Sequence, residues 1–200
     1  MKKLLTTLAI VAFLAASAHA QQIQLNVGDV DVKSIDYDTQ KTPEFQAGGV
    51  NTKKVPNPRD WLEVEVEFKV AGRDDVVVPE LLFRYYIGFT DQNGQGRTLT
   101  GDVKHINVVP GEDYFSAVYV APSTLGELTG DFRRFQPRSV QAVGLEVLYN
   151  GVVVGGKSSR SGSSAKFWQA TGTQPGILAK QDTPFALLWI DRYAEVERTQ

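Results

Sequence analysis

The sequence predicts an all-β protein, an antiparallel β-sandwich of about seven to nine strands with one short helix. Two observations support this fold class. Apolar and polar residues alternate along several short segments rich in Val, Tyr and Phe, which is the period of a half-buried strand. Turn-forming residues separate these segments, and strands joined by tight turns pair antiparallel.

The clearest strand lies at residues 61–70, with the sequence WLEVEVEFKV. Its even-numbered residues are apolar, and three of its odd-numbered residues are glutamates. This alternation buries one face and leaves the other in water. The same criteria predict further strands at 23–27 with 30–37, 81–90, 98–109, 114–121, 140–149, 152–155 and 185–196.

Turn chemistry indicates how the strands connect. Asn150 and Gly151 stand between two apolar runs, and both residue types accept the positive φ of a two-residue hairpin turn. A longer loop, DQNGQG at 91–96, joins another pair of strands. Both connections favour consecutive antiparallel pairing.

The one helix is predicted at about 123–129. Thr124 to Glu127 matches the S/T-x-x-E capping box, and Gly130 can close the helix. Two other stretches, 39–60 and the serine-rich 157–164, are expected to be loops because they are rich in turn-forming or flexible residues.

Residues 1–20 have the pattern of a secretory signal peptide. Lys2 and Lys3 precede an apolar run, and a Ser-Ala-His-Ala sequence ends at Ala20. The run is shorter than the roughly 20 apolar residues that cross a bilayer. We expect cleavage after Ala20, which leaves residues 21–200 as a single domain without a transmembrane segment.

Composition excludes several classes of function. The signal contains two of the 21 basic residues and none of the 23 acidic ones, so the mature chain carries a net charge of −4. Nucleic acid is therefore not expected as a partner, because phosphate binding needs a concentrated basic surface. The chain has no cysteine, which rules out disulfides, thiol catalysis and thiolate metal sites. No cofactor and no metal are expected.

A row of glutamates gives the best hint of catalysis. Glu63, Glu65 and Glu67 repeat at about 7 Å along one strand face, which falls within the carboxylate spacing of inverting glycosidases. The alternative is the solvated face of an ordinary amphipathic strand. In that case cations such as Arg84 or Lys33 on neighbouring strands would balance the row.

Two other polar patterns have ordinary structural explanations. His105 is the one histidine after the signal, and the chain has no G-x-S-x-G sequence, so we expect a histidine on the sheet surface. The loop at 91–96, with Asp102 beyond it, faintly resembles an EF-hand loop. Its flanks read as strands, and we expect a plain hairpin loop.

Aromatic and basic residues supply the candidate binding sites. Trp61 and Trp168 are candidate ligand-binding residues, since an aromatic face can stack on a sugar, and the alternative is packing in the core. Basic residues gather in two loops, Arg133, Arg134 and Arg138 in one and Lys53, Lys54 and Arg59 in the other. Either group could meet an acidic partner or an anionic envelope component, and the alternative is solvated loop charge.

The order of motifs after the signal resembles a known family. The chain reads VDVKSID at 30–36, TPEF at 42–45, then a basic loop, and RDWLEVEVEF at 59–68. This order is similar to the small pilus-like family of secreted immunoglobulin-fold proteins encoded with type IV pilus genes in mucin-associated gut bacteria. The resemblance covers most of the mature chain. It implies an immunoglobulin-like sandwich related to the head of archaeal pilins, and no known catalytic site.

The resemblance implies a non-enzymatic structural or adhesion protein of the pilus or outer envelope. Its expected location is the periplasm, the outer membrane or the cell surface, with pilus or outer-membrane proteins as partners. A pilin keeps its long apolar N-terminal helix, whereas here 21–26 reads as a strand, so an accessory component fits better than a core subunit. The segment 185–196 is the expected assembly edge.

Two alternative functions remain at this point. One is an envelope module that binds host or mucin glycans through Trp61 or Trp168. The other is a glycoside hydrolase that uses the glutamate row.

Overall fold

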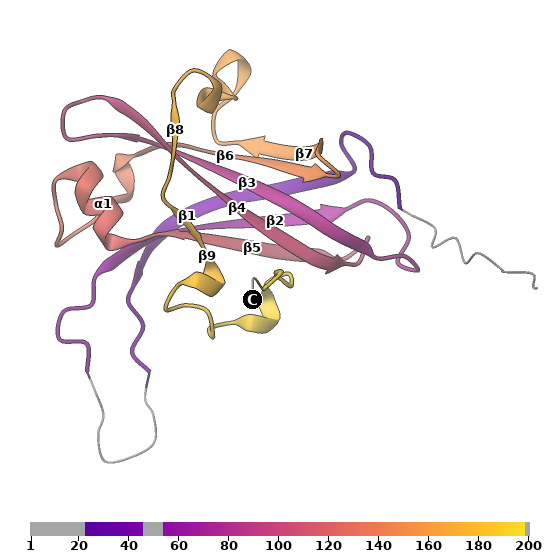
Figure 1. Ribbon diagram of the computed structural model, residues 1–200, viewed down its shortest axis with the longest axis horizontal. Helices are drawn as coiled ribbons and strands as arrows, with labels where there is room; N and C mark the ends of the chain where they lie inside the picture. Colours follow the sequence, from indigo (N-terminus) through magenta and orange to yellow (C-terminus); the bar gives the residue numbers. More distant parts are fainter. Residues whose placement is uncertain (1–22, 46–53, 199–200) are drawn as a thin grey trace, which may run out of the picture.

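The computed structural model describes residues 23–45 and 54–198 and confirms the all-β sandwich (Figure 1). The signal peptide and Lys53 lie outside the described residues. Within those residues there are nine strands and one α-helix. They are β1 (Val30–Lys41), β2 (Asp60–Val70), β3 (Val78–Thr90), β4 (Gly96–Val108), β5 (Asp113–Val120), α1 (Pro122–Thr129), β6 (Val140–Tyr149), β7 (Val152–Ser158), β8 (Thr173–Pro175) and β9 (Ile177–Ala179).

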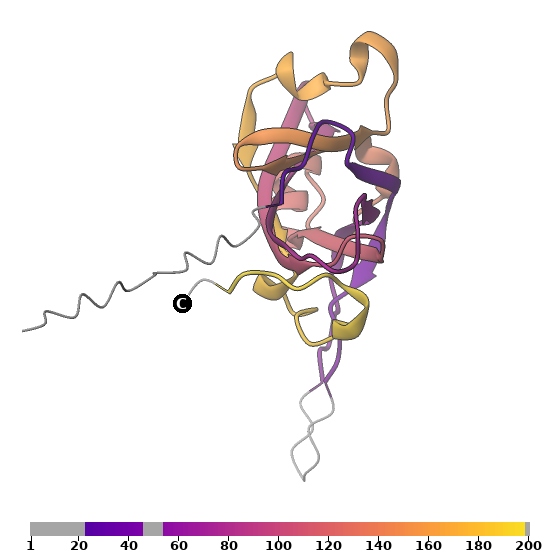
Figure 2. The same ribbon diagram turned by 90° about the vertical axis from the view of Figure 1, so that its right-hand side faces the viewer.

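The strands form a nearly closed sandwich of two layers. Their order is β8-β4-β3-β6-β7-β1-β2-β5-β9, and the first five and the last four make the two layers. Figure 2 looks roughly along the strands and shows them arranged around the core. Pairing is antiparallel except at β1–β7 and β4–β8. The β1–β7 contact joins the two layers at one junction, and at the other junction β4 of one layer approaches β9 of the other.

Glycines allow the layers to meet at both junctions. Val30 of β1 pairs with Gly155 of β7, and a Cβ on Gly155 would lie 2.3 Å from the Val30 carbonyl oxygen. At the other junction a Cβ on Gly101 would lie 2.6 Å from the carbonyl oxygen of Ile177. No side chain fits at either distance, so these two glycines are needed for closure.

The core follows the alternation of the strands. The even-numbered residues of β2, from Leu62 to Val70, are fully buried, as the sequence predicts. Phe68 meets Phe83 of the opposite layer edge-to-face, with ring centroids 4.6 Å apart. Asn150 and Gly151, with φ of 49° and 79°, form the predicted hairpin turn between β6 and β7.

The helix is where the sequence places it, but its start differs. It begins at Pro122 and has no side-chain cap, so Thr124 lies inside the first turn and the predicted capping box does not form. Proline is well suited to this first position because its missing N–H would be unpaired there. Gly130 ends the helix in the left-handed conformation, as expected.

Two strand predictions are corrected by the structure, and two strands were not predicted. The segment 23–27 is not a strand, because Asp29 accepts the backbone N–H of Asn26 at 2.6 Å and turns the chain. The segment 185–196 contains turns and one short 3₁₀ helix at Ile190–Arg192, and Trp189 has a φ of 49° that no strand allows. The strands β8 and β9 are missed, since three residues are too few to show alternation.

Candidate functional site: strand edges and the C-terminal cover

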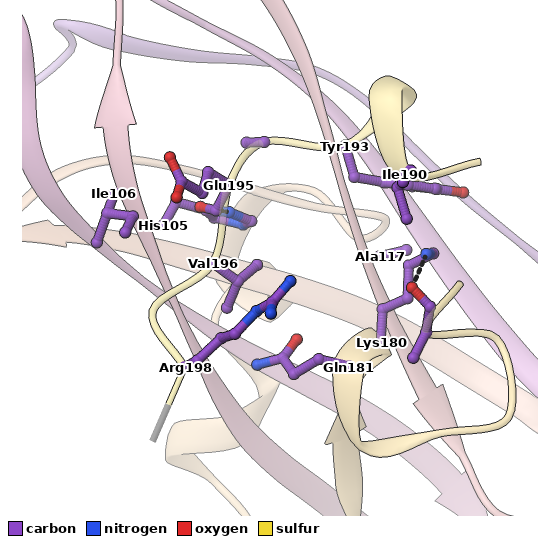
Figure 3. Close-up of a pocket in the computed structure, with 12 residues that line it drawn as sticks. His105, Ile106, Ala117, Lys180, Gln181, Ile190, Tyr193, Glu195, Val196 and Arg198 are labelled. Atoms are coloured by element: carbon purple, nitrogen blue, oxygen red, sulfur yellow. Dashed lines mark hydrogen bonds between the residues drawn. The ribbon is translucent and has the colours of Figure 1, made fainter. Parts of the chain in front are cut away.

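The last part of the chain covers strand edges on one side of the sandwich. We call residues 180–198 the C-terminal cover. Its backbone bridges both layers, because Ala194 N–H donates to the Phe115 carbonyl of β5 at 2.9 Å and Ile106 N–H of β4 donates to the Glu195 carbonyl at 3.0 Å. Figure 3 shows Glu195 and Val196 passing across His105. The cover thus fills the gap where β4 and β5 separate.

His105 is buried beneath this cover, so the predicted surface histidine is wrong. Its Nε2 lies 2.7 Å from Ser116 Oγ, and its Nδ1 lies 3.3 Å from the Glu195 carbonyl oxygen. Tyr85 donates its hydroxyl hydrogen to Ser116 Oγ at 2.6 Å. Burial lowers the pKa of His105 to about 4, which keeps the ring neutral at pH 7. Ser116 is itself fully buried, so this chain of hydrogen bonds fastens the cover to the core.

The glutamates of β2 are all engaged by neighbours, and Glu63 accepts hydrogen bonds from Gln40 and Tyr119. Arg192 of the cover binds Glu65 through two nitrogens, at 3.1 and 2.5 Å, and this contact lowers the pKa of the Glu65 carboxyl. Lys33 reaches Glu67 at 3.2 Å, as the alternative reading of the row predicts. Arg84, in contrast, pairs with Asp102 on β4. A glycosidase acid needs a raised pKa, so this geometry favours an anchoring role for the row.

A second apolar cluster lies on the outer face of β2 and β5. Phe185 of the cover stacks on Tyr119, with ring centroids 4.4 Å apart, and Trp61 meets Phe185 edge-to-face at 5.7 Å. The indole N–H of Trp61 donates to Thr42 Oγ1 at 3.1 Å. Trp61, one of the two candidate ligand-binding residues, therefore packs against the C-terminal cover.

Trp168, the other candidate, is also used in packing. It is 8% exposed and stacks on Tyr86 with ring centroids 4.4 Å apart and an angle of 2°. Its ring lies over Gly144, where a Cβ would approach within 2.2 Å. Trp189, which the sequence places in a strand, is the most exposed of the three tryptophan residues, at 55%. Sugar binding by Trp61 or Trp168 stays a prediction.

The loop at 91–96 forms the expected hairpin between β3 and β4. Asp91 accepts the backbone N–H groups of Asn93 and Gln95 at 2.9 and 2.8 Å, and Arg97 binds its second oxygen at 3.0 Å. Both oxygens of the Asp91 carboxylate are thus used in hydrogen bonds that hold the loop. Within residues 23–45 and 54–198, no three acidic or histidine side chains are grouped closely enough to hold a metal ion.

One long strand edge is open, and it belongs to β1. The strand pairs with β2 from Val30 to Lys41, but on its other side only Val30 pairs with a strand. Lys157 of β7 then donates to the carbonyls of Val32 and Lys33 at 3.1 and 2.7 Å. Beyond these contacts, residues 34–41 have no strand partner on that side within the described parts of the chain.

The shape of β1 presents this edge to solvent. A β-bulge at Lys33 separates the paired beginning of the strand from its open remainder. Asp36, Tyr37 and Asp38 are exposed in succession, so both faces of the strand are wet there. Figures 1 and 2 show the connection that follows β1 and precedes β2, residues 42–45 and 54–59, running out from the sandwich. Charged residues are typical of edge strands, so the charges along β1 are the sequence signal of this edge.

The two basic loops of the sequence meet at one end of the sandwich. Arg59 lines the same surface crevice as Arg133 and Arg134, whereas Arg138 does not line it. No helix in the described residues is long and apolar enough to cross a membrane.

Comparison with known proteins finds similarity over nearly the whole chain. One protein-family model matches residues 20–200. A crystal structure of a protein from Akkermansia muciniphila has the same fold, with a TM-score of 0.75 and 27% sequence identity, over 88% of this chain and 95% of that one. No functionally curated protein matches the sequence.

Proposed function

We propose that this chain is a non-enzymatic protein of the bacterial envelope that associates with pili. The proposal starts from its family, because the chain belongs to the family whose model matches residues 20–200. Its mature domain, 21–200, is exported by the signal at 1–20 and joins its partners by accepting a strand on the open edge of β1. The motif order at 30–36, 42–45 and 59–68 supports the pilus association, because it resembles the pilus-like family.

The unequal protection of the strand edges supports strand addition. The edges of β4 and β5 are covered by β8, β9 and the C-terminal cover, while residues 34–41 of β1 are not. These eight residues extend over roughly 26 Å, long enough for a partner strand of ordinary length. Main-chain hydrogen bonds would supply affinity, and alternate side chains such as Ile35 and Tyr37 would supply specificity.

Site-specific cross-linking in producing cells tests this proposal. A photo-cross-linking residue replaces Asp36 or Asp38 on β1, and Arg84 on β3 serves as the control because β3 has a strand on each side. We expect covalent products with pilus or outer-membrane proteins from the β1 positions and a much lower yield from Arg84. Equal yields at all three positions, or no partner at the β1 positions, would overturn the proposal.

A pair of proline variants tests whether the backbone is involved. Successive N–H groups of a strand point to opposite sides, so Asp36→Pro and Tyr37→Pro remove one N–H that faces β2 and one that faces the open side. The variant that keeps the thermal stability of the wild type is the informative one. It should lose the cross-links made from Asp38, and a wild-type yield in that variant would show that no strand is added here.

A further inference from the structure

We propose that Arg59, Arg133 and Arg134 form a binding site for an acidic polysaccharide that carries sulfate or carboxylate groups. The site lies at the α1 end of the sandwich and differs in residues and chemistry from the strand edge described above.

Two loops that are distant in the sequence form this site. Arg59 precedes β2, and Arg133 and Arg134 follow α1, yet all three line one crevice. Asp60 joins the loops, because its Oδ2 accepts the backbone N–H of Phe135 at 3.2 Å while its Oδ1 binds Lys41 at 2.5 Å. The two loops that carry the three arginines are thus joined by a specific contact.

The nearby carboxylates are already engaged. Asp131 accepts the backbone N–H groups of Arg133 and Arg134 at 2.8 and 3.1 Å, and these bonds lower the pKa of its carboxyl. Asp60 is held by Lys41 and Phe135, as above. Neither acid is bonded to the guanidinium groups of the crevice.

The three guanidinium groups are therefore available to a ligand. All three arginines are exposed, and no salt bridge reaches them within residues 23–45 and 54–198. The remaining stretches, 1–22, 46–53 and 199–200, contain no aspartate or glutamate side chain. Exposed arginines that form no salt bridge suit sulfate and carboxylate, which they bind with two parallel hydrogen bonds.

An aromatic ring stands among these cations. Phe132 lines the same crevice and is 52% exposed. Its ring lies over Gly126 of α1, where a Cβ would approach within 2.3 Å, so the helix holds the ring in place. A fixed, half-exposed ring beside arginines matches a sugar ring with anionic substituents.

The shape of the crevice favours a polymer over a small anion. It holds only about 10 Å³, too little to enclose a sulfate or a sugar, so a ligand must lie across its surface. A polysaccharide chain does this and places several anionic groups against three spread cations. One aromatic side chain supplies little apolar area for insertion into a membrane, so a lipid surface fits less well.

Titration calorimetry with defined oligosaccharides tests the site. The mature protein is titrated with a sulfated chondroitin hexasaccharide, with a hyaluronan hexasaccharide that has carboxylates only, and with neutral maltohexaose. We expect affinity to decrease in that order and to fall as salt rises, because exposed charge pairs are screened. Binding of maltohexaose as tight as that of the sulfated sugar would overturn the proposal.

Two charge-matched triple variants locate the binding. The site variant carries Arg59→Gln, Arg133→Gln and Arg134→Gln, and the control carries Arg73→Gln, Arg160→Gln and Arg198→Gln elsewhere on the surface. Each exposed charge pair changes affinity by about threefold, so the site variant should bind at least about tenfold more weakly than the wild type. The affinity of the control variant should stay within about threefold of the wild type. Both variants lose three positive charges, so a larger loss in the site variant reports on the crevice and not on net charge.

Three further outcomes decide against the proposal. Equal weakening in the two variants would mean that net charge alone attracts the sugar. Unchanged binding in the site variant would place the ligand elsewhere. Tight binding to vesicles with anionic phosphate headgroups, together with no binding of the hexasaccharides, would assign the arginines to a membrane surface. Matching circular dichroism spectra of the variants and the wild type confirm that the fold is intact.

Discussion

His105 is a neutral histidine held between the core and the C-terminal cover, and its environment makes the stability of the protein depend on pH. Its pKa is about 4 in the folded protein and 6.5 in the unfolded chain, so between these values the unfolded chain binds more protons. The free energy of unfolding should therefore fall by about 2 kcal/mol from pH 7 to pH 5. Urea unfolding at the two pH values measures the change.

The matching variant separates this histidine from other groups. His105→Gln should unfold with nearly the same free energy at pH 7 and pH 5, because the mature chain has no other histidine. If the variant keeps the full pH dependence, carboxylates such as Glu65 are responsible instead. The sequence could not show this burial, because the cover that buries His105, including its partner Glu195, lies about ninety residues later in the chain.

At the scale of elements, the C-terminal cover replaces a regular strand. Ala194→Pro removes the N–H that donates to the Phe115 carbonyl at 2.9 Å, at a residue that is 4% exposed. We expect the cover to detach locally, which increases hydrogen exchange at Ile106 of β4 while the central strand β3 stays protected. Hydrogen exchange with mass spectrometry measures both. Unchanged exchange at Ile106 would show that the remaining contacts hold the cover without this bond.

Elements differ in how well their sequences predict them. The alternation in β2 is a local property, and each of its even-numbered apolar residues faces the core as expected. In 185–196 the apolar residues do not alternate, and three of them, Leu187, Trp189 and Ile190, are exposed. β-propensity alone suggested a strand there, while the positive φ of Trp189 and packing against Tyr119 decide otherwise.

At the scale of the whole molecule, edge exposure depends on long-range contacts that no local pattern contains. Ser34 to Lys41 is open because β7 leaves β1 after Gly155, and the convergence of Arg59 with Arg133 depends on the fold of two separate loops. The sequence identified both basic loops but could not bring them together. The strand edge and the arginine crevice both depend on how distant segments of the sandwich come together.

Closure of that sandwich should depend on Gly155. Adding a Cβ there places it 2.3 Å from the Val30 carbonyl oxygen, and the backbone must shift because a carbonyl cannot rotate away as a flexible side chain does. Gly155→Ala should lower the free energy of unfolding by about 1–3 kcal/mol, the usual cost of overpacking. Gly172→Ala is the control, since a Cβ there meets no atom within 4 Å. Thermal unfolding of both variants measures the difference, and equal stability would mean that the two layers do not rely on the contact between β1 and β7.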